Sequence, residues 1–489
     1  MKRVLFILAL ALLLPLPIHA QENVREQYEK FKQKSITSYN SFREQCNKEY
    51  AEFLQRVWES YKVGPTIEKP REEEVPPVVI EEERDQVHPI EDNELSYDEV
   101  VPIPEIEPQP QPVEPVVPAP LPVVQENWCE FDFFGTPMKV RAEDKHKFKL
   151  KSLEGESVAK VWKQLSGKEY DNMLADCLQI RSDYKLSDWA YLLMLLSFSN
   201  TWLNSTNENI LLTAYLFCQS GYKMRLGTND KELCLLYGTK HQVYGIPGYK
   251  IDGYYYYQLN GEDKEMRIAN FTFPKEQALS LAISELPRLN RDESDIRTLT
   301  SQGYKTASSC SINKNLLDFF TFYPTSQLDD NPMTRWALYA NTPIDAKVKT
   351  QLYPSLRKAI EGQDNPKAAD ILLDFVQTAF EYEYDDKVWG TDRAFFAEES
   401  LYYPYCDCED RSILYSHLVR DLLGLDVILV YYPGHLATAV KLNEEVKGDY
   451  ILLNGDKFLV CDPTYIGAPI GMTMPDMDNK TAKVILLKR

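Results

Sequence analysis

The sequence predicts a multidomain α+β protein in which helices pack on antiparallel sheets. Three observations lead to this fold class. The 489 residues are enough for two or three hydrophobic cores. Apolar residues recur with helical spacing in several segments, while other segments are short strand-like runs that end at turn residues. The last sixty residues are almost entirely strand-like, with a hairpin signal at Asn454-Gly455.

Residues 1–20 have the pattern of a secretory signal. Lys2 and Arg3 form a basic start, a short apolar run follows, and the small residue Ala20 precedes "QENVREQ". No later segment approaches the roughly 18 apolar residues that a spanning helix needs. We therefore expect an exported mature chain, periplasmic or extracellular, with no membrane span.

Residues 21–62 and 63–126 precede the globular part of the chain. In the first segment aromatic residues recur three or four apart, which predicts an amphipathic helix that covers its own domain or pairs with a partner as a coiled coil. The second segment holds fourteen of the thirty prolines and carries seventeen acidic residues against three basic ones. Such a composition favours an extended linker.

The remaining charge is only mildly acidic, and no basic patch stands out, so nucleic acid is excluded as a partner. From Trp128 onward the pattern predicts an α+β domain at 127–262, a β-rich insert at 263–345 and a helix-plus-sheet domain at 346–489. The insert is predicted as strands because "RIANFTF", "YKTASSCSI" and "LLDFFTFYP" alternate with turns.

The chemistry-bearing residues gather in the last domain. Cys408 opens a predicted helix that Gly424 closes, and the positive end of a helix dipole favours a thiolate with a lowered pKa. His435 is the first residue after the turn at Pro433-Gly434, and Asp462 ends the last hairpin strand. A thiolate attacks a carbonyl, an imidazole moves the proton, and a carboxylate orients the imidazole, so this order of residues predicts a Cys-His-Asp triad.

The segments "DCEDRSILYSHLVRDLLGL", "PGHLATAV" and "CDPTY" resemble the core of the transglutaminase-like superfamily, over roughly residues 346–489. The resemblance implies a papain-related fold with Cys408 as nucleophile, His435 as general base and acid, and Asp462 as the orienting group. It implies acyl transfer at an amide: peptide hydrolysis, deamidation or transamidation of a peptide or protein, with no cofactor. Peptides of the cell envelope are candidate substrates. The alternative is a catalytically silent binding or scaffold protein of the envelope.

Two other arrangements of the cysteines stay open. Cys406, Cys408, His435 and Cys461 have the composition of a Cys3His zinc site, although the spacing of Cys406 and Cys408 is tighter than usual. Alternatively, Cys406 and Cys461 form a disulfide, since each stands next to a triad member. We favour the triad, with no metal and Cys406 as a bystander.

The sequence also predicts roles for four further residues near the site. Gln377 is either an oxyanion donor or a plain surface glutamine. Glu409 and Asp410 are expected to cap the start of the helix. His417 is expected on a helix face.

The middle domain resembles a degenerate copy of the last one. Aligning Gly221 with Gly424 superposes two helices, and Ser205 then takes the place of Cys408. His241 lies at a different spacing and no Asp-Pro follows, so we do not expect catalysis there.

Overall fold

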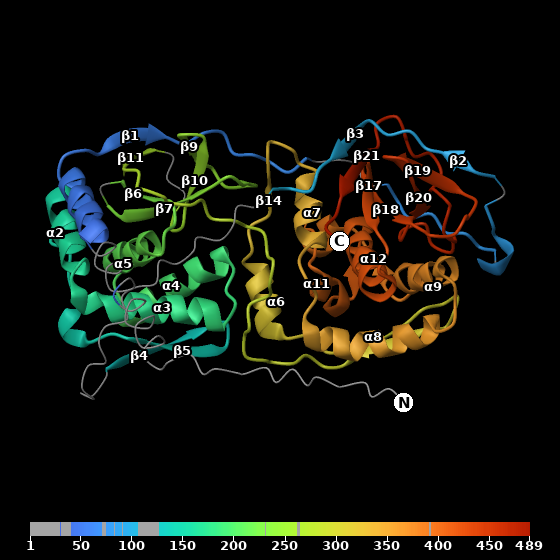
Figure 1. Ribbon diagram of the computed structural model, residues 1–489, viewed down its shortest axis with the longest axis horizontal. Helices are drawn as coiled ribbons and strands as arrows, with labels where there is room; N and C mark the ends of the chain where they lie inside the picture. Colours follow the sequence, from blue (N-terminus) through green and yellow to red (C-terminus); the bar gives the residue numbers. More distant parts are fainter. Residues whose placement is uncertain are drawn as a thin grey trace, which may run out of the picture.

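The computed structural model describes residues 30, 41–70, 75–82, 84–89, 91–105, 127–229, 231–261, 265–390 and 393–489. The predicted signal, residues 1–20, lies outside them. The chain forms two α+β halves side by side, each with a sheet along the upper edge of Figure 1 and helices beneath it. The coarse prediction of α+β architecture with antiparallel sheets is therefore confirmed.

The N-terminal half contains a six-stranded sheet with helices beneath it and a separate hairpin. In sheet order the strands are β1 (Glu59–Lys62), β11 (Glu265–Ala269), β6 (Met224–Thr228), β7 (Leu233–Thr239), β10 (Tyr254–Gln258) and β9 (Tyr249–Ile251). The helices are α2 (Gly155–Leu165), α3 (Asp171–Asp183), α4 (Asp188–Leu203) and α5 (Thr206–Gln219), with short turns η2 (Asp144–His146) and η3 (Lys168–Tyr170). The hairpin consists of β4 (Trp128–Phe133) and β5 (Thr136–Arg141).

The C-terminal half contains a seven-stranded sheet. In order the strands are β2 (Asn93–Glu94), β19 (Asp449–Leu453), β20 (Asp456–Cys461), β18 (His435–Lys441), β17 (Val427–Tyr432), β21 (Lys483–Leu486) and β3 (Glu99–Val101). The helices are α8 (Ala346–Ile360), α9 (Asn365–Thr378), α10 (Asp385–Val388), α11 (Ala397–Tyr402) and α12 (Cys408–Leu423). A two-stranded pair, β15 (Glu381–Tyr382) and β16 (Tyr405–Cys406), leads into α12.

The local predictions around α12 are confirmed. Cys408 is its first residue, and Gly424 ends it in the left-handed region at φ 67°. His435 is the first residue of β18. The hairpin of β19 and β20 turns at Asn454 and Gly455, both with positive φ, as a two-residue turn with this sequence requires.

The predicted β-rich insert, residues 263–345, does not exist as a unit. β11 belongs to the N-terminal sheet, whereas β13 (Ala307–Cys310) pairs with β12 (Arg297–Thr300) and packs on α8 of the C-terminal half. The run "LLDFF" lies in a helix, α6 (Lys314–Thr321), because Asn313 caps it and its buried side chains fall on one helical face. A second helix, α7 (Thr334–Ala340), follows the short pair of β8 (Gln242–Val243) and β14 (Ser326–Gln327).

The predicted helix over residues 21–62 is too long within its described part. Residues 41–54 are helical and pack on the N-terminal half, where Tyr50 meets the ring of Trp162 edge-on at 4.6 Å. Residues 59–62 are instead the edge strand β1, paired with β11. The aromatic spacing continued into the strand because Trp58 and Tyr61 also pack against apolar neighbours there.

The two sheets share one strand order. In spatial order, β11-β6-β7-β10-β9 in the N-terminal half matches β21-β17-β18-β20-β19 in the C-terminal half, and every pairing is antiparallel. In each half the second strand of this order is the first to follow the helix along the chain. α5 precedes the first set and packs on α4, just as α12 precedes the second set and packs on α9. This repeated topology agrees with the helix alignment on Gly221 and Gly424.

The acidic, Pro-rich segment is not a free linker over its described part. We call residues 75–105 the strap, of which 75–82, 84–89 and 91–105 are described. The strap leaves the N-terminal half, crosses to the far side of the C-terminal half and returns (Figure 1, blue). β2 pairs with β19 at one sheet edge and β3 with β21 at the other. The prediction of a linker at 63–126 is wrong there, because main-chain pairing and scattered apolar side chains offset the unfavourable composition.

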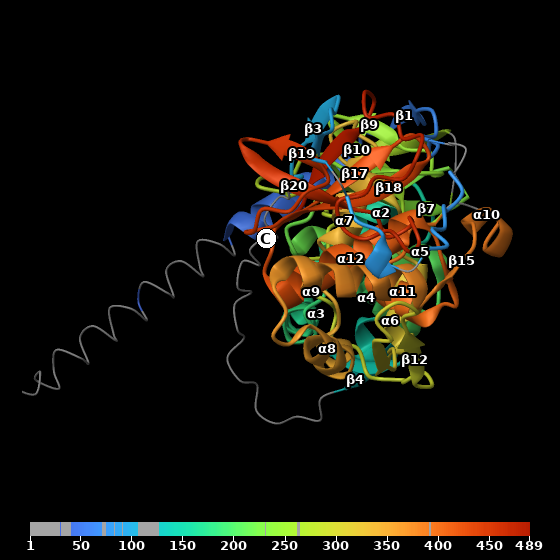
Figure 2. The same cartoon turned by 90° about the vertical axis from the view of Figure 1, so that its right-hand side faces the viewer.

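Strap residues also pack on the helical side of the C-terminal half. The short turn η1 (Arg84–Gln86) lies in front of the helices in Figure 2, and Arg84 forms an ion pair with Asp370 of α9. The strap therefore pairs with both edges of the sheet and contacts one of the helices below it.

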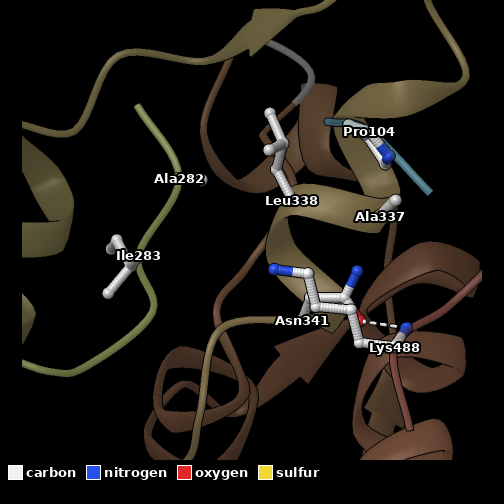
Figure 3. A pocket seen from close by; sticks show the side chains of 7 residues that line it. All are labelled: Pro104, Ala282, Ile283, Ala337, Leu338, Asn341 and Lys488. Carbon is white, nitrogen blue, oxygen red and sulfur yellow. Dashed lines mark hydrogen bonds between the residues drawn. The ribbon is translucent and has the colours of Figure 1, made fainter. Parts of the chain in front are cut away.

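The junction of the two halves is closely packed. One hydrophobic cluster runs continuously from Tyr50 in the first half to Leu436 in the second. A small cavity remains beside α7, with a volume of about 10 Å³, which is at the lower limit of what one water molecule needs. Figure 3 shows its lining, which draws on the end of the strap, the loop at 282–283, α7 and Lys488, whose N–H donates to Asn341 Oδ1 at 2.9 Å. Among the described residues, no helix is both long and apolar enough to cross a bilayer.

The packing of the strap leads to a test on stability. Val101, in β3, is fully buried, whereas Val79 is 59% exposed. We expect Val101→Ala to lower the free energy of unfolding by about 2 kcal/mol, because it removes buried methyl groups. The matched Val79→Ala should change it by less than about 0.5 kcal/mol. Denaturant unfolding measures both. Equal, negligible effects would mean that the strap is a free linker after all.

Candidate active site

The centre of the candidate site is a hydrogen-bonded His–Asp pair between two neighbouring strands. His435 begins β18 just after Gly434, whose φ of 74° allows the tight turn, and Asp462 follows the last residue of β20. Because β18 and β20 pair side by side, the two side chains meet, with His435 Nε2 and Asp462 Oδ2 2.8 Å apart. Both are sealed from solvent, with side-chain exposures of 0% and 1%.

The pair is rigidly held and leaves one nitrogen free. Asp462 Oδ1 accepts from the N–H groups of Thr464 and Tyr465, so the carboxylate cannot rotate without losing bonds. Tyr432 stacks near the imidazole, with ring centroids 6.3 Å apart. His435 Nδ1 is buried and has no hydrogen-bond partner. A buried, unpaired ring nitrogen is costly, which marks Nδ1 as the atom available for chemistry.

Cys408 lies beside this pair at the start of α12. Ser412, one turn along the helix, donates to the carbonyl oxygen of Leu436, which fixes α12 against the start of β18. The Cys408 sulfur lies 3.1 Å from Glu409 Oε2 and also meets the N–H of Leu436. Both residues are described, and no hydrogen bond joins the Cys408 sulfur to the His435 ring. The structure therefore brings the three predicted residues to one place but pairs the thiol with Glu409.

The expectation of a lowered thiol pKa is wrong for this arrangement. Burial raises the pKa of Cys408 well above its usual range, and the carboxylates of Glu409 and Asp407 raise it further. The N–H of Leu436 acts in the opposite direction but does not prevail. The helix dipole alone could not outweigh desolvation and two like charges. The thiol is therefore neutral at physiological pH in this state.

Gln377 is neither an oxyanion donor nor a surface residue. It is 1% exposed, and its Nε2 donates to the carbonyl oxygens of Asp462, Tyr465 and Ala468 at 2.7–3.1 Å. Its two hydrogens are already used, so none remains for an oxyanion. Its Oε1 accepts from Arg84 of the strap at 2.7 Å. The sequence analysis missed Arg84, although a lone arginine within "EEERDQ" was the available signal.

The alternative cysteine arrangements are not formed. Cys406 Sγ lies 4.0 Å from the carbonyl oxygen of Glu381, whereas Cys461 Sγ lies 3.5 Å from that of Leu459. All nine cysteines are described, and all carry free thiols. None of the groups of described residues whose ligand atoms converge combines Cys408 with Cys406, His435 or Cys461. Those groups are Asp407 with Cys408 and Glu409, and Asp385 with Asp407 and Asp410.

Asp410 caps α12, as predicted, but Glu409 does not. Asp410 Oδ2 accepts from the N–H of Asp407, and Oδ1 accepts from that of Phe395 at 2.8 Å. Burial, followed by the charges of Asp385 and Glu409, raises the pKa of Asp410 well above its usual range. A protonated Asp410 lets the neighbouring carboxylates lie close without an ion.

His417 and His241, which lie outside the site, are structural. His417 is buried on α12, and burial lowers its pKa to about 3. His241 is buried too, with a pKa of about 3 for the same reason, and both its nitrogens are engaged, by Ser326 and by the N–H of Leu281. In the matching topology, the position of His435 is taken by Leu233 at the start of β7, and that of Asp462 by Leu259 after β10. The N-terminal half therefore repeats the frame without the residues of the triad.

A scan against protein-family models and searches of curated proteins and of solved structures found no match to this chain.

The segment before Cys408 leads to a pH-dependent prediction. Burial raises the pKa of Glu398, on α11, to about 7. The folded protein therefore holds a proton that the unfolded chain releases near pH 4.5, so this part of the stability is present below 4.5 and lost as pH rises to 7. Relative to wild type, Glu398→Gln should gain on the order of 3 kcal/mol between pH 4.5 and 7.5. Denaturant unfolding at several pH values measures this, with the exposed Glu361→Gln as control. Parallel curves for all three proteins would contradict it.

A second prediction concerns the thiol. Glu409→Gln removes the largest charge that raises the pKa of Cys408. We expect alkylation of Cys408 by iodoacetamide at pH 8 to accelerate, by about tenfold for each unit of lowered pKa. Peptide mapping by mass spectrometry follows the modification of Cys408. Glu444→Gln, on an exposed loop, serves as the control. An unchanged rate in Glu409→Gln would mean that Glu409 does not govern the thiol.

Proposed function

We propose that this chain is an exported cysteine-nucleophile enzyme that transfers acyl groups from amide bonds through Cys408, His435 and Asp462. The observation that carries the proposal is the buried His435–Asp462 pair, whose second ring nitrogen has no partner and lies at the start of the strand beside Cys408. The resemblance of the motifs around the three residues to the transglutaminase-like superfamily supports the same chemistry.

The proposed reaction has two halves. His435 Nδ1 accepts the thiol proton as the sulfur attacks the amide carbonyl, and the resulting imidazolium is stabilised by Asp462. The imidazolium then gives the proton to the leaving amine, the C–N bond breaks and a thioester remains on Cys408. Water or a primary amine, deprotonated by His435, attacks the thioester and releases the acid or a new amide. An amine acceptor gives transamidation, whereas water gives peptide hydrolysis when the attacked amide is in the backbone and deamidation when it is in a side chain.

The described state is a resting state in this scheme. The thiol contacts Glu409 instead of the imidazole, and its pKa is raised. Reaction requires the sulfur to leave Glu409 for Nδ1, because an imidazolium formed there would stabilise the thiolate.

The state of the Cys408 thiol favours a second candidate, a catalytically silent binding or scaffold domain. A neutral, buried thiol held by a carboxylate is what a retained fold without chemistry would also contain. An exported protein of this type would bind envelope peptides without cleaving them. The two candidates differ in whether Cys408 reacts in a manner that depends on His435.

An electrophilic, cysteine-directed amide probe separates the candidates. We expect the wild type to be labelled, Cys408→Ala to lose labelling completely and Cys406→Ala to keep most of it. His435→Ala should reduce the rate by at least about a hundredfold, the usual scale of a general base. Intact-mass spectrometry measures the labelled fraction. Equal loss in both cysteine variants together with bound zinc would favour a metal site, and labelling that ignores His435 would favour the silent domain.

A further inference from the structure

The strap reaches the candidate site through one buried arginine. Arg84 is 7% exposed at its side chain and faces Asp370 and Gln377, which lie seven residues apart on one face of α9. Its Nη2 donates to Asp370 Oδ1 at 2.6 Å, and its Nη1 donates to Gln377 Oε1 at 2.7 Å. The ring of Tyr304 lies 5.8 Å from the guanidinium carbon, and its hydroxyl donates to Asp370 as well.

The bond to Arg84 fixes which way the amide of Gln377 points. An amide carries an acceptor on one side and two donors on the other. Because a guanidinium has only donors, Oε1 must face Arg84, and Nε2 must face the opposite way. There it meets the carbonyl oxygens of Asp462, Tyr465 and Ala468. Turning the amide over would set donors against donors on one side and acceptors against acceptors on the other.

The three carbonyls belong to the loop that carries the triad carboxylate. The first of these carbonyls is the main-chain carbonyl of Asp462 itself. The side-chain Oδ1 of Asp462 accepts from N–H groups inside the same loop. Asp370, which pairs with Arg84, also holds the far end of the loop, since the N–H of Ile470 donates to Asp370 Oδ1 at 3.1 Å. The strap adds main-chain bonds at Ile466, which accepts from the N–H of Ile80 and donates to Val78.

We propose that Arg84 and Gln377 are positioning residues, which act through the loop at 462–470 to hold the Asp462 carboxylate against His435. The strap is then a component of the candidate site and not a connection between domains. This inference rests on the proposed function for the chemical role of His435, but its geometry does not involve the thiol.

Comparing the titration of the His435 ring between variants reports whether the carboxylate stays in contact. The titratable groups that face the imidazole are Asp462 after β20, Tyr432 on β17 and Cys408 at the start of α12, with Glu409 beside the thiol. A carboxylate in contact favours the imidazolium, so a variant that displaces the carboxylate should make the ring titrate at lower pH than in the parent protein. Arg84→Lys keeps the charge but loses the fork that reaches both partners, and Gln377→Ala changes no charge.

The experiment is a pH titration by NMR with selective ¹³C labelling of the six histidine rings. The full chain is used in the Cys408→Ala background, which makes the readout independent of whether the thiol reacts. His435→Ala assigns the signal, and Asp462→Ala sets the full downward shift. We expect Arg84→Lys and Gln377→Ala each to give part of that shift, and neither to add to it when combined with Asp462→Ala. Arg141→Lys, which alters a similar arginine–aspartate pair with Asp176 in the other half, should leave His435 unchanged.

Several outcomes would overturn the proposal. An unchanged or raised pKa of His435 in both variants would do so, as would equal shifts in the Arg141→Lys control. A variant that loses its near-ultraviolet circular dichroism is set aside and the other decides. Loss of fold in both would mean that the pair supports the whole half and not the carboxylate. Because His435 titrates in the absence of the thiol, a silent enzyme with shifted variants would refute the proposed function and leave this inference standing.

Discussion

The burial of the Arg84 charge is the constraint on which the arrangement of the C-terminal half depends. Removing a guanidinium from water costs several kcal/mol unless its donors are paired, and here Asp370 and Gln377 of α9 supply the partners. Once this pair is formed, the register of the strap is set. Its next residues then lie against β19 as β2, and later ones against β21 as β3. A sheet that would otherwise expose both edges is closed by a segment from elsewhere in the chain.

This arrangement explains which parts of the fold the sequence could predict. α12, the turn before His435 and the hairpin at Asn454-Gly455 are encoded by local signals, namely apolar period, a terminal glycine and turn residues. β1, β2 and β3 have no such signal, because their conformation comes from pairing with distant strands. The helix α6 was mistaken for a strand since a short apolar run fits both patterns, and only its cap at Asn313 distinguishes them.

For the candidate site as well, local sequence signals predict some properties and not others. The identities and positions of Cys408, His435 and Asp462 follow from their places at the ends of local elements. Their electrostatics do not, because burial is a property of the whole fold and reverses the direction expected for the thiol pKa. The role of Gln377 was likewise inaccessible from α9 alone. Its neighbours, Arg84 and the loop after Asp462, lie 293 and 85 residues away along the chain.

The repeated topology shows that a few residues distinguish the half with the candidate site from the half without it. Both halves place a helix start beside the first residue of a strand and the residue after another strand. In the N-terminal half the two strand positions hold Leu233 and Leu259, and the interior there is sealed by apolar packing. In the C-terminal half they hold an ionisable pair, which can stay buried only if the carboxylate is fixed on every side. That requirement accounts for the hydrogen bonds from Thr464 and Tyr465 and for the amide of Gln377 behind them. The same strand topology accommodates apolar or ionisable residues at these positions. The ionisable pair needs additional support, and Arg84 of the strap, which lies far from it along the chain, supplies it.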